Sequence, residues 1–390
     1  MEEGGREGLL RVLYVTIFLN ATGLGTCTFL LPVFAETLGA SYTDLGVMGA
    51  VGNIAYAVIT LACGLLLDRY ERVRLYTVFT LAAGLTMTMF MFTSTIRQLT
   101  LMRGLLGVFS ATFWVSASTL TADISPKATL TQAMGRYNLS WITGFTVGPL
   151  VGGVISKSYG FRGLFASLTS LLILSLIIIS VRFGGKVELR TESKTGSIDL
   201  GSLRGLLLSY ATLLPFTLVL GIYMAIMPGH MSVVGLSSSL IGFLITMTNG
   251  VRGLMFMCVG RFVAWGTRRS VFAAAVLLAA SMFLARLASG LMGFALPLFL
   301  YGVGSGIMTP VILDFIAKRT SKEALGSAMG VHEGVYGVGM FIGPFAGGLI
   351  ADAYGASTMY TLLVAASLLI LPLGYLMTLS QRGGQETSTL

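Results

Sequence analysis

The chain has 390 residues, of which 55% are hydrophobic and 11% are charged. An ordinary soluble domain carries about 25% charged residues, so this composition excludes an ordinary water-soluble protein. The net charge of +9 does not indicate a nucleic-acid partner, because the basic residues are scattered between apolar runs and form no stripe. The composition therefore predicts an integral membrane protein in a lipid bilayer.

Apolar runs of about 20 residues, the length that crosses about 30 Å of hydrocarbon, recur along the whole chain. The first half holds six, at 11–35, 45–67, 73–95, 98–121, 133–156 and 162–181. The second half holds six more, at 205–229, 240–262, 270–289, 291–315, 326–350 and 358–379. We therefore predict an all-α membrane protein of twelve transmembrane helices, with six-helix bundles at 1–181 and 205–390 and a polar linker at 182–204.

Basic residues crowd the loops on one side of the predicted bundle. The opposite loops hold only Arg97, Lys157 and Arg162. Since lysine and arginine are enriched in cytoplasmic loops, we predict a multi-pass protein of the prokaryotic plasma (inner) membrane with both termini and the linker in the cytoplasm.

The two halves are sequence repeats. Residues 133–160 repeat at 328–355, and Asn53 aligns with Asn249 when the first half is laid on the second. Six helices return the chain to its starting side, so the repeats are parallel and related by an axis along the membrane normal. Two such bundles around a central solute site are typical of a transporter that alternates access between the two sides.

A loop motif follows the second predicted span, where residues 64–74 read GLLLDRYERVR. It resembles the GxxxDRxGRR loop of the major facilitator superfamily, and the matching positions are Gly64, Asp68, Arg69 and Arg72. Glu71 stands where that family usually has glycine. The resemblance implies a gate on the cytoplasmic side, because a carboxylate at a helix end can meet a helix N-terminus or a facing arginine. The alternative is a topogenic basic loop with an incidental aspartate.

A glycine motif, GxxxGPxxGG, occurs once in each half. Its members are Gly144, Gly148, Pro149, Gly152 and Gly153, and then Gly339, Gly343, Pro344, Gly347 and Gly348. Glycines four residues apart lie on one helix face and permit close packing, and proline can kink the helix. The first copy resembles the antiporter motif of the same superfamily, which implies proton-coupled drug export. The alternative is a general packing seam.

Three charged residues lie more than one helical turn inside the predicted spans. Arg103 fits the RxxxG of the superfamily's fourth helix, which implies a part in proton coupling, or it snorkels to the outer interface. Arg252 and Glu333, with His332 beside it, lie at matching depths in their spans. Either Arg252 and Glu333 form a buried ion pair, or Arg252 meets an anionic substrate group and leaves Glu333 to carry the proton.

Four asparagines are also predicted inside the membrane: Asn20, Asn53, Asn138 and Asn249. They predict polar groups around a central cavity, or else hydrogen bonds between helices.

The chain shows no nucleophile–base pairing, metal-ligand spacing or phosphate-binding loop, so we predict neither an enzyme nor a cofactor or metal. The resemblance implies a secondary active transporter similar to the twelve-helix drug:proton antiporter branch. It would export amphipathic small molecules by alternating access, as a monomer, with protons as the coupling ion. Two alternatives are uptake or facilitated transport of a small metabolite or organic anion, and a membrane receptor or scaffold that does not transport.

Overall fold

The computed structural model describes residues 3–183, 204–320 and 324–386, and every regular element in these ranges is a helix. The first half comprises α1 (Glu3–Thr37), α2 (Tyr42–Arg69), α3 (Arg72–Phe90), α4 (Ile96–Ile124), η1 (Lys127–Thr129) and α5 (Leu130–Phe183). The second half comprises η2 (Arg204–Leu206), α6 (Leu207–Ala225), α7 (Met227–Val233), α8 (Ser238–Met257), α9 (Val259–Trp265), α10 (Thr267–Arg286), α11 (Gly290–Lys318), α12 (Leu325–Tyr354) and α13 (Ala356–Glu386).

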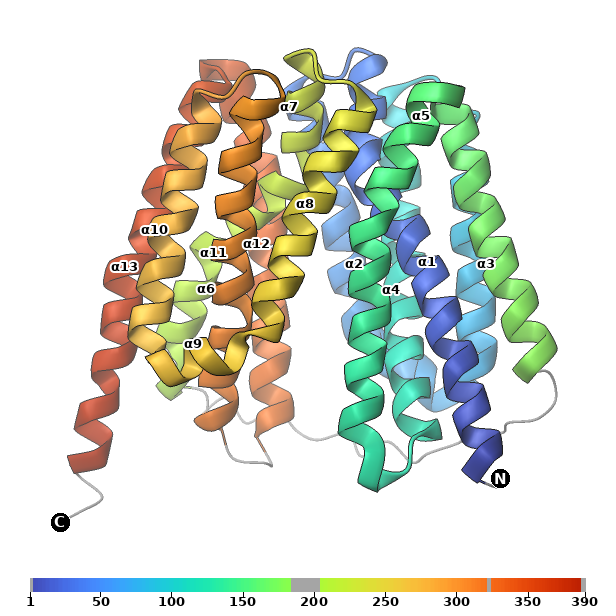
Figure 1. Cartoon of the computed structure of the whole chain (residues 1–390), viewed down its shortest axis with the longest axis horizontal. Coiled ribbons are helices and arrows are strands. Elements are labelled where there is room, and N and C mark those ends of the chain that lie inside the picture. The colour runs from blue at the N-terminus through green and yellow to red at the C-terminus, as the bar shows by residue number, and fades with distance from the viewer. Residues whose placement is uncertain (1–2, 184–203, 321–323, 387–390) are drawn as a thin grey trace.

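Helix α5 contains two of the predicted spans. Its backbone leaves the helical conformation at Gly160, where φ is 71° and ψ is 177°. Glycine adopts this positive φ without a steric penalty, so the chain reverses there and forms two antiparallel arms (Figure 1). Eleven described helices are long and apolar enough to cross a membrane. With α5 counted as two, the twelve predicted spans are confirmed.

Two of the predicted spans are interrupted. The span at 205–229 breaks between α6 and α7, where Pro228 lacks the backbone N–H that a continuous helix would use. The span at 240–262 breaks at Cys258, whose N–H bonds to Met255 and Phe256 in a tight turn. The chain keeps its general direction from α6 to α7, whereas α9 turns away from the axis of α8 (Figure 1).

The helices form two groups that match the predicted halves. In the first, α1 packs on α5 and α4 packs on α2 and α3; in the second, α10 packs on α11 and α13, and α6 packs on α12. Both termini lie at one end of the molecule, which we name the terminal end, and the opposite one is the far end (Figure 1). The two groups meet at the far end and diverge toward the terminal end. Of the predicted linker 182–204, residues 184–203 lie outside the described residues.

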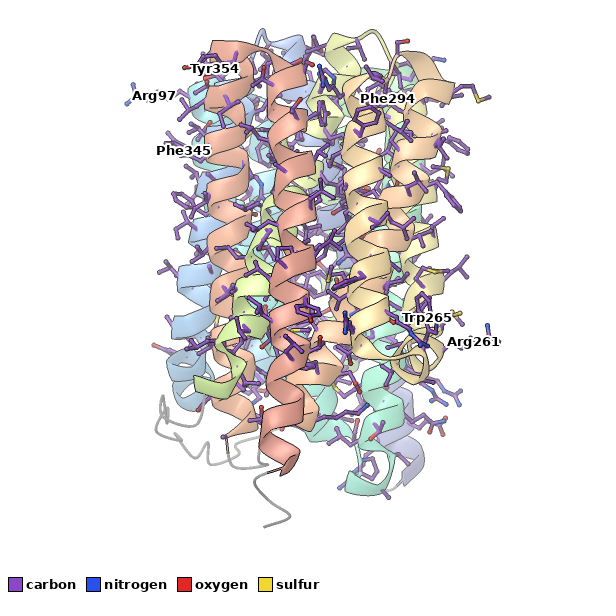
Figure 2. The ribbon with its side chains drawn as sticks, turned by 90° about the vertical axis from the view of Figure 1, so that its left-hand side faces the viewer. Arg97, Arg261, Trp265, Phe294, Phe345 and Tyr354 are labelled. Carbon is purple, nitrogen blue, oxygen red and sulfur yellow. The ribbon has the colours of Figure 1, made fainter. Side chains whose placement is uncertain are left out.

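Exposed side chains mark the outer flanks of the molecule. Figure 2 shows Arg97 and Tyr354 near the far end, and Arg261 and Trp265 toward the terminal end. Phe345 projects from the flank between these levels and is 42% exposed. Aromatic rings at two levels with an apolar surface between them are typical of a chain that crosses a bilayer. The protein is therefore a multi-pass membrane protein.

Candidate functional site

A cavity of about 730 Å³ lies between the two halves. Its described lining comes from α1, α2, α4 and α5 of the first half and from α6, α8, α11 and α12 of the second. Ligand pockets for drug-sized molecules usually measure about 300–1,000 Å³. A site that both halves share is also placed to respond when they move relative to each other.

Backbone contacts between the halves close this cavity toward the far end. A Cβ atom added at Gly46 of α2 would run into the carbonyl oxygen of Pro344 in α12, and one at Gly242 of α8 would run into that of Pro149 in α5. A Cβ atom added at Gly153 would likewise lie only 2.5 Å from the carbonyl oxygen of Ser238. Only glycine permits helices to approach this closely.

Polar contacts reinforce the same closure. The Asp352 carboxylate of α12 accepts hydrogen bonds from the backbone N–H groups of Tyr42 at 3.0 Å and Thr43 at 2.7 Å, at the first turn of α2. Ser232 donates to Glu36 at 2.7 Å, again between halves. The far end is therefore closed, and the cavity is reached from the terminal end.

Asn53 and Asn249 form a symmetric pair of hydrogen bonds across the halves. The Asn53 amide donates to the carbonyl of Met340 at 2.8 Å, and the Asn249 amide donates to the carbonyl of Phe145 at 3.1 Å. The two asparagines occupy equivalent places in the repeat. Their geometry matches the hydrogen-bonding alternative, and Asn53 also lines the cavity.

Asn20 and Asn138 differ in their location. Asn20 is buried inside the first half, where its amide donates to Ser175 at 2.6 Å and to the carbonyl of Thr16 at 2.8 Å. Asn20 is not among the described residues that line the cavity, so it is not placed to contact a solute in this conformation. Asn138 lines the cavity and accepts a hydrogen bond from the indole of Trp141 at 3.0 Å.

Arg103 lines the closed end of the cavity. Arg103 lies about 10 Å along α4 from the helix start at Ile96. Its guanidinium packs on the backbone of Gly52. A Cβ atom added at Gly52 would lie 2.5 to 2.8 Å from three atoms of this guanidinium. Among the described residues it forms no ion pair. An arginine inside a span costs about 2.5 to 3.5 kcal/mol on insertion scales, so this charge needs water or a ligand.

Arg252 lines the cavity from the second half. Its guanidinium lies 5.3 Å from the ring centroid of Phe256 and close to the hydroxyl of Tyr336. Its Nε atom is buried and has no hydrogen-bond partner among the described residues. Arg252 is thus another cation of the cavity wall, and no carboxylate of the described residues forms an ion pair with it.

Glu333 forms no ion pair with Arg252 in this conformation. The Glu333 side chain is 66% exposed, and its Oε1 lies 3.1 Å from Nδ1 of His332, which is 4% exposed. The matching depths of Arg252 and Glu333 do not bring them together, because depth does not fix the rotation of a side chain about its helix axis. Glu333 therefore stands open to water within the cavity.

Aromatic side chains that the sequence did not single out form one wall of the cavity. The ring of Phe145 lies 6.1 Å from that of Trp114 and 5.8 Å from that of Trp141. All three line the cavity, together with Tyr56 and Tyr336. No sequence signal identified them, since apolar rings on a membrane helix can face lipid, another helix or a cavity equally well.

The helix segments that carry the glycine motif pack through two of their faces. Gly144, Gly148 and Gly152 pack against α1, and their counterparts Gly339, Gly343 and Gly347 pack against α6 within the second half. The second face carries the Pro149 and Pro344 carbonyls that meet the opposite half. The motif thus builds each half and also closes the far end.

We expect Gly148→Leu to destabilise the protein. A Cβ at Gly148 would lie 2.6 Å from the Thr22 carbonyl oxygen and 2.6 Å from the Thr26 hydroxyl. Overpacking of this kind typically costs about 1 to 3 kcal/mol. Thermal unfolding of the purified protein should show a lower midpoint, whereas Gly330→Leu, at a glycine with open space around it, should leave the midpoint unchanged. Equal midpoints for both variants would contradict close packing at Gly148.

The loop motif is described only in part. Arg72 is buried and forms an ion pair with Asp123, near the end of α4. The side chains of Asp68 and Arg69, and the surroundings of Gly64, lie outside the described residues. Among the described residues no cluster of histidine, cysteine and acidic side chains could hold a metal ion.

Known proteins resemble this chain over nearly its whole length. The family profile described as Major Facilitator Superfamily matches residues 13–220 and 209–389. An uncharacterized MFS-type transporter of Methanocaldococcus jannaschii is 25% identical over 96% of this chain and 99% of its own length. The multi-drug resistance efflux pump PmrA of Streptococcus pneumoniae is 27% identical over 90% of this chain and 91% of its own. The crystal structure of a bacterial homolog of the human lysosomal transporter Spinster, inward-facing and unoccupied, has a TM-score of 0.80 at 14% identity and covers 97% of this chain and 98% of its own.

Proposed function

Because the chain belongs to the Major Facilitator Superfamily, we propose that it exports amphipathic small molecules in exchange for protons by alternating access. The observation that carries this proposal is the amphipathic cavity between the halves, closed at one end and containing the water-exposed carboxylate of Glu333. A relative similar over 90% of the chain bears the name of a multi-drug resistance efflux pump, which favours export.

The orientation of the molecule completes the proposal. The excess of basic residues on the terminal side supports cytoplasmic termini in a plasma membrane. The cavity of this conformation then opens to the cytoplasm, where an exporter loads its solute. We further propose that 1–181 and 205–390 move as two bundles joined by the 182–204 linker, and that a single chain suffices, because the cavity draws its lining from both halves of one chain.

Transport into proteoliposomes tests this function. Compounds that raise the thermal stability of the purified protein identify a ligand of the folded state, and the labelled ligand is then followed across the bilayer. We expect counterflow at equal pH, and accumulation driven by a pH gradient in the direction of export. Counterflow without a response to pH would favour facilitated passage of a metabolite. Binding without counterflow would favour a receptor.

The loop motif supplies a second test. We expect Asp68→Asn to reduce transport strongly while folded protein remains in the membrane, because the carboxylate would serve as a latch only in the conformation closed at the cytoplasmic side. Counterflow rate and the amount of purified monodisperse protein are the two measurements. Asp44→Asn is the control, because Asp44 caps α2 at the far end. Wild-type counterflow in Asp68→Asn would contradict the latch.

A further inference from the structure

Two cationic side chains from opposite halves line one cavity. Arg103 extends from α4 of the first half and Arg252 from α8 of the second. The single carboxylate among the described lining residues belongs to Glu333, and its neighbour is His332 rather than either arginine. The described wall of the cavity therefore carries more positive than negative charge.

Neither arginine is neutralised by the fold. Arginine keeps its charge under all conditions relevant to proteins, and neither side chain forms an ion pair among the described residues. The Arg252 Nε atom is also buried without a hydrogen-bond partner. A charge inside a span is stabilised by water or by an opposite charge, and both guanidinium groups are partly exposed on the cavity wall. An anion that enters the cavity can therefore pair with them.

The surroundings of the two arginines indicate what that partner carries besides its charge. The rings of Trp114, Trp141 and Phe145 form a continuous aromatic wall on the first half, and Phe256 lies beneath the Arg252 guanidinium at 5.3 Å. Flat apolar groups stack on such rings, and a planar guanidinium binds a carboxylate or a sulfonate through two parallel hydrogen bonds.

Building on the transport function proposed above, we propose that the solutes are amphipathic organic anions. The aromatic part of the molecule lies against Trp114, Trp141 and Phe145, and the anionic group is attracted by the positive charges of Arg103 and Arg252 on the same cavity wall. A cationic solute would meet two like charges in a site of low dielectric, which opposes its binding. The cavity thus selects for charge as well as for apolar surface.

Binding of three compounds with one ring system tests this charge selection. We would use 2-naphthoate as the anion, 2-naphthamide as the neutral molecule and 2-naphthylmethylammonium as the cation, and measure their affinities for the purified full-length protein by isothermal titration calorimetry. Charge-assisted hydrogen bonds support an expected preference of about tenfold or more for 2-naphthoate over each of the other two. Equal or tighter binding of the cation, or no binding of 2-naphthoate, would overturn the proposal.

Substitutions at the arginines assign the selection to its residues. Arg103→Gln and Arg252→Gln should each weaken 2-naphthoate binding by about tenfold or more and leave 2-naphthamide binding within about twofold. Arg252→Lys should retain part of the preference, because lysine keeps the charge but loses the planar fork. Arg261→Gln, at an exposed arginine outside the cavity, should change neither affinity. An undiminished preference in folded Arg103→Gln and Arg252→Gln proteins would refute the assignment.

The same three compounds distinguish a failure of the proposed transport function from a failure of the proposed charge selection. Counterflow of 2-naphthamide but not of 2-naphthoate would leave a transporter without anion selectivity. Selective binding of 2-naphthoate without counterflow of any of the three compounds would retain the anion site and refute the transport function.

Discussion

Export driven by a pH gradient is expected to stop in Glu333→Gln, while solute exchange at equal pH continues. Glu333 is the one carboxylate among the described residues of the cavity wall, and its 66% exposure lets it exchange protons with water in this conformation. Glutamine has nearly the same shape but cannot take up a proton. Exchange needs no net proton transfer, so this half of the cycle should survive.

The expected size of this effect follows from the membrane potential. One proton that moves down 100 mV releases about 2.3 kcal/mol. At about 1.4 kcal/mol for each factor of ten, the proton alone contributes a concentration ratio of roughly fifty-fold. Accumulation in proteoliposomes should therefore fall from that range to no accumulation in Glu333→Gln.

Folding should be unaffected by the same change. Since Glu333 does not pair with Arg252 in this structure, its neutralisation leaves no buried arginine without its partner. Glu7→Gln is a suitable control, because Glu7 is an exposed carboxylate paired with Arg11 outside the cavity. If Glu333→Gln accumulates solute as the wild-type protein does, the coupling proton is carried elsewhere. If exchange and folding fail together, Glu333 has a structural role.

The number and course of the helices could be predicted from the sequence because each span must contain an apolar run long enough to cross the bilayer. The turn at Gly160 fell between two predicted spans for the same reason. The breaks at Ile226 and Cys258 were missed, since they interrupt apolar runs without changing their composition. Hydropathy reports which residues tolerate lipid, and a local change of backbone direction leaves no trace in it.

The direction in which a side chain points about its helix axis was harder to predict than the place of the helix in the sequence. Asn20 and Asn53 are both polar residues in apolar runs, yet Asn20 bonds to Ser175 within its own half and Asn53 bonds to Met340 of the opposite half. Depth along a span follows from counting residues, but rotation about the axis depends on which neighbour packs where. This is also why Arg252 and Glu333, at matching depths, form no ion pair.

Comparison of the two repeats indicated contacts between the halves that no single residue indicated. Asn53 and Asn249 align in the two halves, and each donates to a backbone carbonyl of the opposite half. The repeat also equates Gly46 with Gly242 and Pro344 with Pro149, and the structure pairs them crosswise at the far end. In a parallel repeat, a contact between the halves that lies off the symmetry axis can occur twice. A motif shared by both copies therefore indicates a residue at the interface or within each bundle core.

Gly46→Leu combined with Gly242→Leu is expected to prevent closure of the far end and to shift the protein toward the conformation open on that side. Each added side chain would run into a backbone carbonyl, of Pro344 or Pro149, which cannot turn aside as the end of a flexible side chain can. At about 1 to 3 kcal/mol for each overpacked contact, each substitution disfavours the present conformation by about fivefold to more than a hundredfold.

Spin labels at the far end would measure this shift. Tyr159 and Tyr354 are 78% and 74% exposed and lie on opposite halves, so cysteines placed there, in a chain without Cys27, Cys63 and Cys258, report the separation by double electron–electron resonance. We expect a longer distance in the double variant and slower counterflow, because the cycle must pass through the closed far end. Gly135→Leu, at an exposed glycine with open space around it, should leave the distance unchanged. An unaltered distance in the folded double variant would mean that these glycines do not control closure, and that the polar contacts of Asp352 with the start of α2 are sufficient to hold the two halves together.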